Sequence, residues 1–214
     1  MSKSIALITT SVRTPRVGPN VSAFVKTILD PLAAAADLAI APVDLADFKL
    51  PIYDEAVIPA MVVPGAADGP QFAHAHTIAW TSEIAKHAGY VLVIPEYNYG
   101  VSGGTKNAID YLMHEWIGKP VVVVSYGIKG GAFASEQVSH MLGQMKLKVA
   151  PTKPQLAFVG GHGPELFGAM LKGELGEETK KEWIGKKGEV EKAFEELKEL
   201  LEEKAEEKTE AKAE

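Results

Sequence analysis

The sequence lacks cysteine altogether across its 214 residues. A disulfide framework, a thiolate metal site and a cysteine nucleophile are therefore excluded. Long hydrophobic runs are also missing. The longest apolar runs in the sequence are far too short to cross a bilayer. The N-terminus leads directly into SIALITT, without the apolar core of a secretory signal. We therefore expect no membrane partner and a cytoplasmic location.

An excess of one charge is lacking from most of the chain. The formal net charge is -6, and residues 189–214, with 11 Glu and 5 Lys, account for all of it. The remainder carries 17 basic and 17 acidic residues. Residues 1–188 are thus balanced in charge and have no overall positive field, so we expect no nucleic-acid partner. Any bound anion must be held by a local group of residues.

Several catalytic and binding motifs are also absent. Neither GxGxxG nor GxxxxGK[ST] occurs, so a dinucleotide-type Rossmann turn and nucleotide triphosphatase activity are not indicated. His114 does not begin an HExxH motif, because Gly118 stands where the second histidine would be. His74 and His76 would point to different faces of an expected helix and make a poor metal pair. Ser125 has no GxSxG elbow. We predict no metal site and no hydrolytic chemistry.

What the sequence contains is a regular alternation of two kinds of segment. Short apolar runs occupy residues 5–9, 38–43, 91–94, 121–125 and 156–159. Amphipathic stretches with helical spacing occupy residues 21–35, 72–86, 105–116 and 134–145. Alternating strands and helices predict an α/β fold with a parallel sheet covered on both faces.

Two segments interrupt or follow this alternation. Residues 59–70 hold three prolines and two glycines, which predicts a surface loop that either shapes a site from the side or is a simple connection. Residues 189–201 carry apolar residues at helical spacing, whereas residues 202–214 have no large apolar side chain. We therefore predict a domain of residues 1–185, followed by a charged C-terminal helix and tail over residues 186–214.

The first candidate site is the polar loop that follows the first apolar run and opens into a helix near Val21. Its residues 9–20 read TTSVRTPRVGPN. Hydroxyl groups, the forked guanidinium groups of Arg13 and Arg16, and the free amides of a helix start all suit a phosphate. In the alternative interpretation both arginines are solvated and Asn20 only caps the helix.

The second candidate is the run PEYNYGVSGGTKNAID, residues 95–110, which joins a strand to a helix. Two aromatic rings and an amide beside glycine backbone suit a flat heterocycle. Alternatively, the run is a tight turn whose tyrosines pack against a neighbouring element or a second subunit. The residues at its start are Pro95, Glu96, Tyr97, Asn98, Tyr99 and Gly100.

The third candidate is the glycine-rich loop SYGIKGG, residues 125–131, which also lies between a strand and a helix. Glycine-rich turns are common, so this loop is weak evidence taken alone. Carboxyl ends of parallel strands meet at one edge of a sheet, and ligands bind there in open α/β sheets. We therefore expect this loop to form the opposite wall of one crevice.

Taken together, TTSVRTPRVGPNV, DLADFKLPIYDE, PEYNYGVSGGTKNAIDYL and HEWIGKPVVVVSYGIKGG resemble the NADPH-dependent FMN reductase family of flavodoxin-like flavoproteins. The pair HEWxGKP and SYGxxGG is most similar to the fungal NAD(P)H-dependent quinone reductases. The resemblance covers about residues 4–160. It implies a flavodoxin-like, doubly wound, five-stranded parallel sheet of strand order 2-1-3-4-5, with FMN at the switch between the first and third strands.

The resemblance also assigns the loops. It implies that the FMN phosphate is held by Ser11, Arg13, Arg16, Asn20 and Val21. It implies that the flavin ring and ribityl chain are lined by residues 95–100 and closed on the other side by Ser125, Tyr126, Gly127 and Gly130. NADPH or NADH would be the co-substrate and a quinone or similar flat molecule the acceptor. The cofactor performs such chemistry, so we expect no catalytic side chain.

Family resemblance further implies a homodimer or homotetramer, for which His114, Trp116 and Tyr111 are candidate subunit contacts. The leading hypothesis is an FMN-dependent NAD(P)H oxidoreductase that acts on quinones. The alternative is an FMN-binding, redox-responsive interaction protein, whose acidic tail and oligomer surface recruit a partner.

Overall fold

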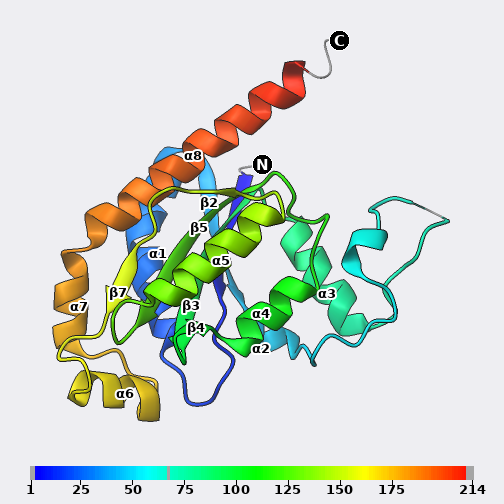
Figure 1. Ribbon diagram of the computed structural model, residues 1–214. Coiled ribbons are helices and arrows are strands. Elements are labelled where there is room, and N and C mark those ends of the chain that lie inside the picture. The colour runs from blue at the N-terminus through cyan, green and yellow to red at the C-terminus, as the bar shows by residue number, and fades with distance from the viewer. Residues whose placement is uncertain (1–2, 67, 211–214) are drawn as a thin grey trace.

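The structure is a computed structural model that describes residues 3–66 and 68–210, and the sheet lies at its centre (Figure 1). Four parallel strands run in the order β2-β1-β3-β5. Their bounds are β1 (Lys3–Thr9), β2 (Leu38–Asp44), β3 (Gly89–Tyr97) and β5 (Pro120–Gly127). Together with the outer strands beside β5, this arrangement confirms the expected flavodoxin-like order.

The edge of the sheet beyond β5 differs from the single strand expected over residues 156–159. Two short parallel strands share this position, β6 (Lys148–Val149) and β7 (Gln155–Ala157). They pair with opposite ends of β5. Pro151 and Pro154 lie between them and have no backbone N–H to donate, so a continuous strand is interrupted there. With the antiparallel β4 (Gly100–Val101), the described residues form seven strands rather than five.

Four helices match the expected amphipathic stretches. They are α1 (Gly18–Ala35), α3 (Ala75–Ala85), α4 (Gly103–Asp110) and α5 (Ala132–Gln144). The remaining helical segments are α2 (Leu45–Phe48), the short 3-10 helix η1 (Pro59–Met61), α6 (Pro164–Lys172), α7 (Glu177–Ile184) and α8 (Lys187–Glu210). Of these, only α8 overlaps a segment for which we expected a helix.

Carboxylate side chains explain two helix boundaries that differ from expectation. The amides of Ala73 and His74 donate to the carboxylate of Glu55, both at 2.9 Å, so α3 begins after them and not at residue 72. His74 therefore precedes the helix, and its ring stacks on that of His76, contrary to the expectation of different faces. The amide of Met113 donates to Glu115, and α4 ends at residue 110 instead of 116.

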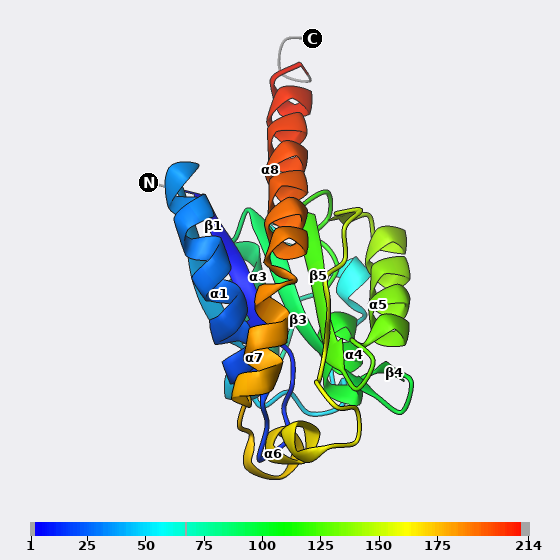
Figure 2. The same ribbon diagram turned by 90° about the vertical axis from the view of Figure 1, so that its left-hand side faces the viewer.

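Side chains of each strand alternate between two cores. In β1, Ile5 and Leu7 face α1, whereas Ala6 and Ile8 face the side covered by α3. The first core also holds residues of α6, α7 and α8, and the second holds residues of α4 and α5. Helices thus cover both faces of the sheet, as Figure 1 shows with α1 and α8 on one side and α3 and α4 on the other, and Figure 2 shows α8 lying in front of the strands.

The C-terminal helix α8 packs on the face of the sheet that α1 covers. Its buried apolar residues are Val190, Ala193, Phe194, Leu197 and Leu201. Glu202 and Glu203 are exposed. Helix α8 continues to Glu210, and the last four residues of the expected tail lie outside the described residues. The division between residues 185 and 186 stays a prediction.

The expectation that Tyr111 and Trp116 form a subunit contact is wrong. Both side chains lie in the core beneath α3 and α4, with Trp116 only 2% exposed. The hydroxyl of Tyr111 donates to Asp54. His114 is partly exposed and hydrogen-bonds the carbonyl oxygen of Ala60 at 2.9 Å. Among the helices described, none has both the length and the apolar character needed to cross a membrane.

Candidate functional site

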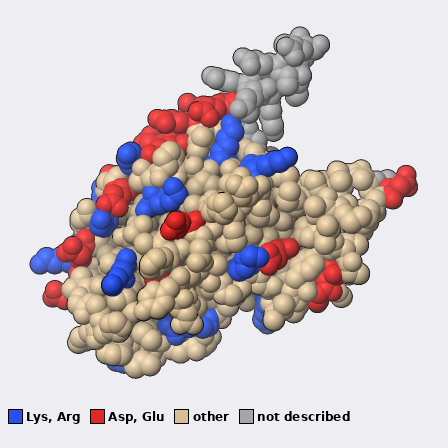
Figure 3. Space-filling model, viewed as in Figure 1, with Lys and Arg blue, Asp and Glu red and all other residues tan. Residues whose placement is uncertain are grey.

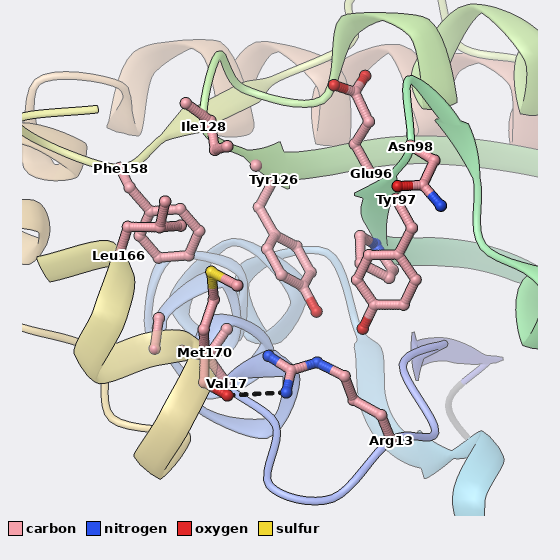
Figure 4. Close-up of a pocket in the computed structure, with 13 residues that line it drawn as sticks. Arg13, Val17, Glu96, Tyr97, Asn98, Tyr126, Ile128, Phe158, Leu166 and Met170 are labelled. Carbon is pink, nitrogen blue, oxygen red and sulfur yellow. Dashed lines mark hydrogen bonds between the residues drawn. The ribbon is translucent and has the colours of Figure 1, made fainter. Parts of the chain in front are cut away.

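A cavity of about 520 Å³ lies at the carboxyl ends of β1, β3 and β5 (Figure 4). All three predicted loops reach it, and α6 forms a further wall. The lining residues are Arg13, Val17, Pro95, Glu96, Tyr97, Asn98, Tyr126, Gly127, Ile128, Phe158, Leu166, Ala169 and Met170. Residues 59–66 and 68–70 do not line this cavity, so nothing in the structure supports a role for them in shaping it.

Behind the cavity, the loop after β1 brings a hydroxyl group to the start of α1. The Oγ atom of Ser11 is buried and lies beside the hydroxyl of Tyr126, but it forms no hydrogen bond of regular geometry with the described residues. A Cβ atom at Gly18 would lie 2.0 Å from this oxygen and 2.9 Å from the hydroxyl of Tyr126. Glycine is therefore required for both hydroxyl groups to approach the first turn of α1, where backbone amides and the helix dipole favour an anion.

Arg13 extends from the same loop toward the cavity, and in Figure 4 its guanidinium lies near the hydroxyl groups of Tyr97 and Tyr126. Its Nη1 donates to the carbonyl oxygens of Pro15 at 2.6 Å and Met170 at 2.8 Å. Within the described residues, the structure shows no hydrogen bond from its Nε or Nη2. Arg13 thus has further donors in a fork that suits a phosphate.

The other predicted phosphate residues contact protein groups. Arg16 pairs with both carboxylate oxygens of Asp44, at 2.9 and 2.7 Å, and donates to the carbonyl oxygen of Ser11. The hydrogen bond with Asp44 raises the pKa of Arg16. The amide side chain of Asn20 donates to the carbonyl oxygen of Gly173, and Val21 is fully buried in the core. These three residues hold the loop and α1 in place.

The second loop is a tight hairpin between β3 and β4. Tyr97 pairs with Gly100, and the two residues between them, Asn98 and Tyr99, have φ angles of 49° and 61°. Two consecutive positive φ angles are typical of a type I′ turn, which matches the twist of paired strands. Tyr97 and Asn98 consequently line the cavity. Tyr99 is 79% exposed and its ring lies 6.1 Å from that of Phe133 instead.

Glu96 links this hairpin to the third loop. Its carboxylate accepts hydrogen bonds from the amides of Phe133 at 2.9 Å and Ala134 at 3.2 Å, in the first turn of α5. The N-cap position of α5 is Gly131, which has no side chain to cap the helix. Glu96 therefore supplies the cap from another strand, and a negative charge there is stabilised by the helix dipole.

In the third loop, Tyr126 and Gly127 line the cavity, while Ser125 and Gly130 shape the turn. The hydroxyl of Ser125 donates to the carbonyl oxygen of Gly130 at 2.7 Å, and Gly130 has a φ angle of 82°. Burial raises the pKa of the Tyr126 phenol, so its hydroxyl stays protonated and remains a hydrogen-bond donor near neutral pH.

Six lining residues were not predicted, and three of them come from α6. The sequence contains a signal for this helix, because Pro164 stands at its start and Gly173 just after its end. Leu166, Ala169 and Met170 have the i, i+3, i+4 spacing of one helix face. The other residues that sequence reasoning missed are Val17, Ile128 and Phe158.

Residues 4–162 match the family model described as NADPH-dependent FMN reductase. The chain belongs to the NADPH-dependent FMN reductase family. As a member, it is a flavin-dependent oxidoreductase with FMN as its cofactor and NAD(P)H as its co-substrate. The matched residues end just before α6.

Sequence similarity to individual proteins supports the same family membership. The NAD(P)H-dependent FMN reductase ntnL of Nectria sp is 50% identical over 200 residues, which cover 92% of this chain and 96% of that protein. A quinone reductase of Escherichia coli is 39% identical over 89 residues, covering 39% of this chain and 46% of the other.

Among solved structures, the flavoenzyme FerB, an NAD(P)H:(acceptor) oxidoreductase of Paracoccus denitrificans, has the same fold. The TM-score is 0.63 at 18% identity, with 92% of this chain and 98% of that chain covered.

Proposed function

We propose that this family member transfers hydride from NAD(P)H through bound FMN to quinones or similar flat electron acceptors. The observation that carries the proposal is that Arg13, Tyr97 and Tyr126 line the same cavity. The guanidinium of Arg13 suits a phosphate group, and the two tyrosine rings suit a flat heterocycle. The quinone reductase of Escherichia coli among the relatives supports the acceptor class.

For the phosphate end, we propose that Ser11 and Arg13 bind the cofactor directly. Glycine at position 18 lets the Ser11 hydroxyl lie against the first turn of α1, and this hydroxyl is the donor that we propose for a phosphate oxygen there. Arg16, Asn20 and Val21 then act by holding the loop and helix in position.

For the ring end, we propose that Tyr97 and Asn98 contact the flavin from one side and Tyr126 and Gly127 from the other. The remaining predicted residues shape these walls: Pro95, Glu96, Tyr99, Gly100, Ser125 and Gly130. Bound FMN would supply hydride transfer between NAD(P)H and the acceptor, and the proton that completes a hydroquinone would come from water, so we expect no side-chain acid or base.

The contribution of the chain is binding, orientation and exclusion of water. The buried hydroxyl of Tyr126 is a donor that burial keeps protonated. Phe158 and Leu166 give the cavity an apolar wall, which strengthens hydrogen bonds formed inside it. We expect the protein to work in the cytoplasm, as a homodimer or homotetramer.

The visible spectrum of the purified protein, recorded before and after addition of NADPH, tests the proposal. We expect an oxidised flavin spectrum that NADPH bleaches and a quinone restores. Colourless protein that neither binds added FMN nor oxidises NAD(P)H with a quinone would refute it. A comparison of kcat/KM for quinone, azo dye, ferric chelate and free FMN then tests the acceptor, for which we expect the highest value with the quinone.

The acidic surface of α8 favours a second candidate function, the redox-responsive interaction protein. Figure 3 shows acidic side chains gathered along the described part of α8, whereas basic and acidic side chains are interspersed over the rest of that face. This function would be supported if NAD(P)H reduced the bound flavin only slowly while flavin reduction changed the binding of a partner protein.

A further inference from the structure

Helix α6 belongs to the wall of the cavity but follows the residues that match the family. The match ends at residue 162, and α6 begins at Pro164. Leu166, Ala169 and Met170 face the cavity from this helix. In Figure 4 the side chains of Leu166 and Met170 lie across the cavity from Tyr97. This wall therefore lies outside the residues that match the family model.

The C-terminal end of α6 is bound to the loop after β1 and to the start of α1. Arg13 Nη1 donates to the carbonyl oxygen of Met170, and Asn20 Nδ2 donates to that of Gly173, both at 2.8 Å. Gly173 has a φ angle of 73°, and a Cβ atom there would lie 2.6 Å from the carbonyl oxygen of Arg16. The close approach thus depends on glycine at this position.

The hydrogen bond to Met170 fixes one of the two terminal nitrogen atoms of the long, flexible Arg13 side chain. Carbonyl oxygens at the C-terminal end of a helix carry partial negative charge, which attracts the guanidinium of Arg13. With Nη1 held by Pro15 of its own loop and by Met170 of α6, the remaining donors of Arg13 are restricted to the cavity side (Figure 4). Holding a binding group in its productive conformation before the ligand arrives improves affinity, because less side-chain entropy is lost on binding.

We infer that α6 is an auxiliary part of the cofactor site, which positions Arg13 for the FMN phosphate and thereby slows release of FMN. The inference rests on the proposed function, in which Arg13 binds that phosphate. Because coupling between two binding events is reciprocal, FMN should in turn stabilise α6 against local opening. Riboflavin lacks the phosphate and should not do so through Arg13.

The first test compares two glycine-to-alanine variants of the full chain, Gly173→Ala and Gly168→Ala. Gly173→Ala forces the end of α6 away from the loop, whereas a Cβ atom at Gly168 meets nothing within 4 Å. We expect Gly173→Ala to speed FMN dissociation about tenfold, equivalent to about 1.4 kcal/mol. Gly168→Ala should leave the rate unchanged or slower. Dissociation is followed by the recovery of flavin fluorescence on dilution.

Two further comparisons decide whether α6 acts through Arg13. Riboflavin dissociation should be the same in Gly173→Ala as in the unmodified protein. In an Arg13→Ala background, Gly173→Ala should have no further effect on FMN, since the coupled partner is already absent. Equal acceleration of FMN and riboflavin, or additive effects of the two substitutions, would overturn the inference.

A measurement on the unmodified protein keeps the test valid if Gly173→Ala does not fold. Amide hydrogen exchange over residues 164–172 should be slowed more by FMN than by riboflavin. Equal protection by both flavins would overturn the role of α6. A protein that binds no FMN would refute the proposed function itself, whereas normal FMN binding with an unchanged rate in Gly173→Ala refutes only the inference about α6.

Discussion

Two arginines of the same loop have different partners, although they look equivalent in the sequence. Arg16 is paired with Asp44, 28 residues away along the chain, and both of its Nη atoms are engaged. Within the described residues the hydrogen bonds of Arg13 go to carbonyl oxygens, and its side chain reaches the cavity. A bidentate pair with a carboxylate satisfies a guanidinium more completely than neutral acceptors do. Arg13 is therefore the arginine that we propose for anion binding.

We predict that Arg13→Ala weakens FMN binding by ~1.5 to 3 kcal/mol, the scale of a hydrogen bond to a charged group. Riboflavin affinity should change little, because riboflavin has no phosphate for Arg13 to contact. Fluorescence titration of flavin-free protein with each flavin measures both. Arg13→Lys is the matched control, and it should recover part of the loss because it keeps the charge without the fork. Unchanged FMN affinity in Arg13→Ala would remove Arg13 from the phosphate site.

The buried His87 predicts a dependence of stability on pH. Burial lowers the pKa of His87, despite an opposing effect of Glu83, whose carboxylate lies 3.2 Å from its Nε2. Because the pKa is lower in the folded than in the unfolded protein, the neutral ring stabilises the fold above the ordinary pKa of 6.5. That contribution is lost as the pH falls through the lowered value.

Between pH 7.5 and 5, the free energy of unfolding should therefore fall more steeply in the unmodified protein than in His87→Gln. Urea unfolding at several pH values measures it. The slope difference isolates His87, since the other titrating groups are common to both proteins. Parallel slopes would mean that the pKa of His87 is not lowered by folding.

At the level of elements, the β3–β4 hairpin depends on a strained residue. Tyr99 has a φ angle of 61°, a conformation that costs non-glycine residues about 1 to 2 kcal/mol. Its ring is exposed and contributes little packing. The strain is retained beside the proposed flavin site, where a type I′ turn places Tyr97 and Asn98 on the cavity wall.

We predict opposite effects for two substitutions of Tyr99. Tyr99→Gly should leave stability unchanged or raise it, because glycine adopts positive φ freely. Tyr99→Val should destabilise the protein, since a β-branched side chain resists that conformation more than the unbranched Tyr side chain does. Thermal and urea unfolding measure both variants. Equal stability of the two would argue against the left-handed conformation of this residue.

At the level of the whole molecule, α8 completes the core on one face of the sheet. Phe194 is fully buried between α8 and that face, together with Trp183 of α7. Although residues 189–214 are mostly charged in composition, the helix that begins in this region has a narrow apolar stripe that packs into the core. The charged side chains of the described part of α8 lie on its outer face, as Figure 3 shows.

Phe194→Ala should lower the free energy of unfolding by about 3 to 5 kcal/mol, the usual cost of emptying a buried aromatic site. Glu202→Ala on the same helix is the matched control and should change stability by less than about 0.5 kcal/mol, because its side chain is exposed. Chemical denaturation measures both. A small effect of Phe194→Ala would indicate that α8 is not an essential part of the core.

Much of the fold and the place of the site could be predicted because they depend on local pattern. Short apolar runs alternating with amphipathic stretches indicated the parallel sheet, and the motifs by which the chain resembles its family indicated strand order and cofactor. The three glycine-containing loops follow strands, and parallel strands present their carboxyl ends at one edge. The order of strands and loops is therefore sufficient to predict that Arg13, Tyr97 and Tyr126 lie near one another.

The tertiary structure alone determined the contacts between residues that are distant in the chain. The bond from Arg13 to Met170 spans 157 residues, and the capping of α5 by Glu96 spans 37 and 38. Such contacts leave no local periodicity, because their energy depends on how complete elements pack against each other. By itself the sequence determined the sheet, the loops and the family. Packing determined which side chains of those loops face the cavity and made α6 one of its walls.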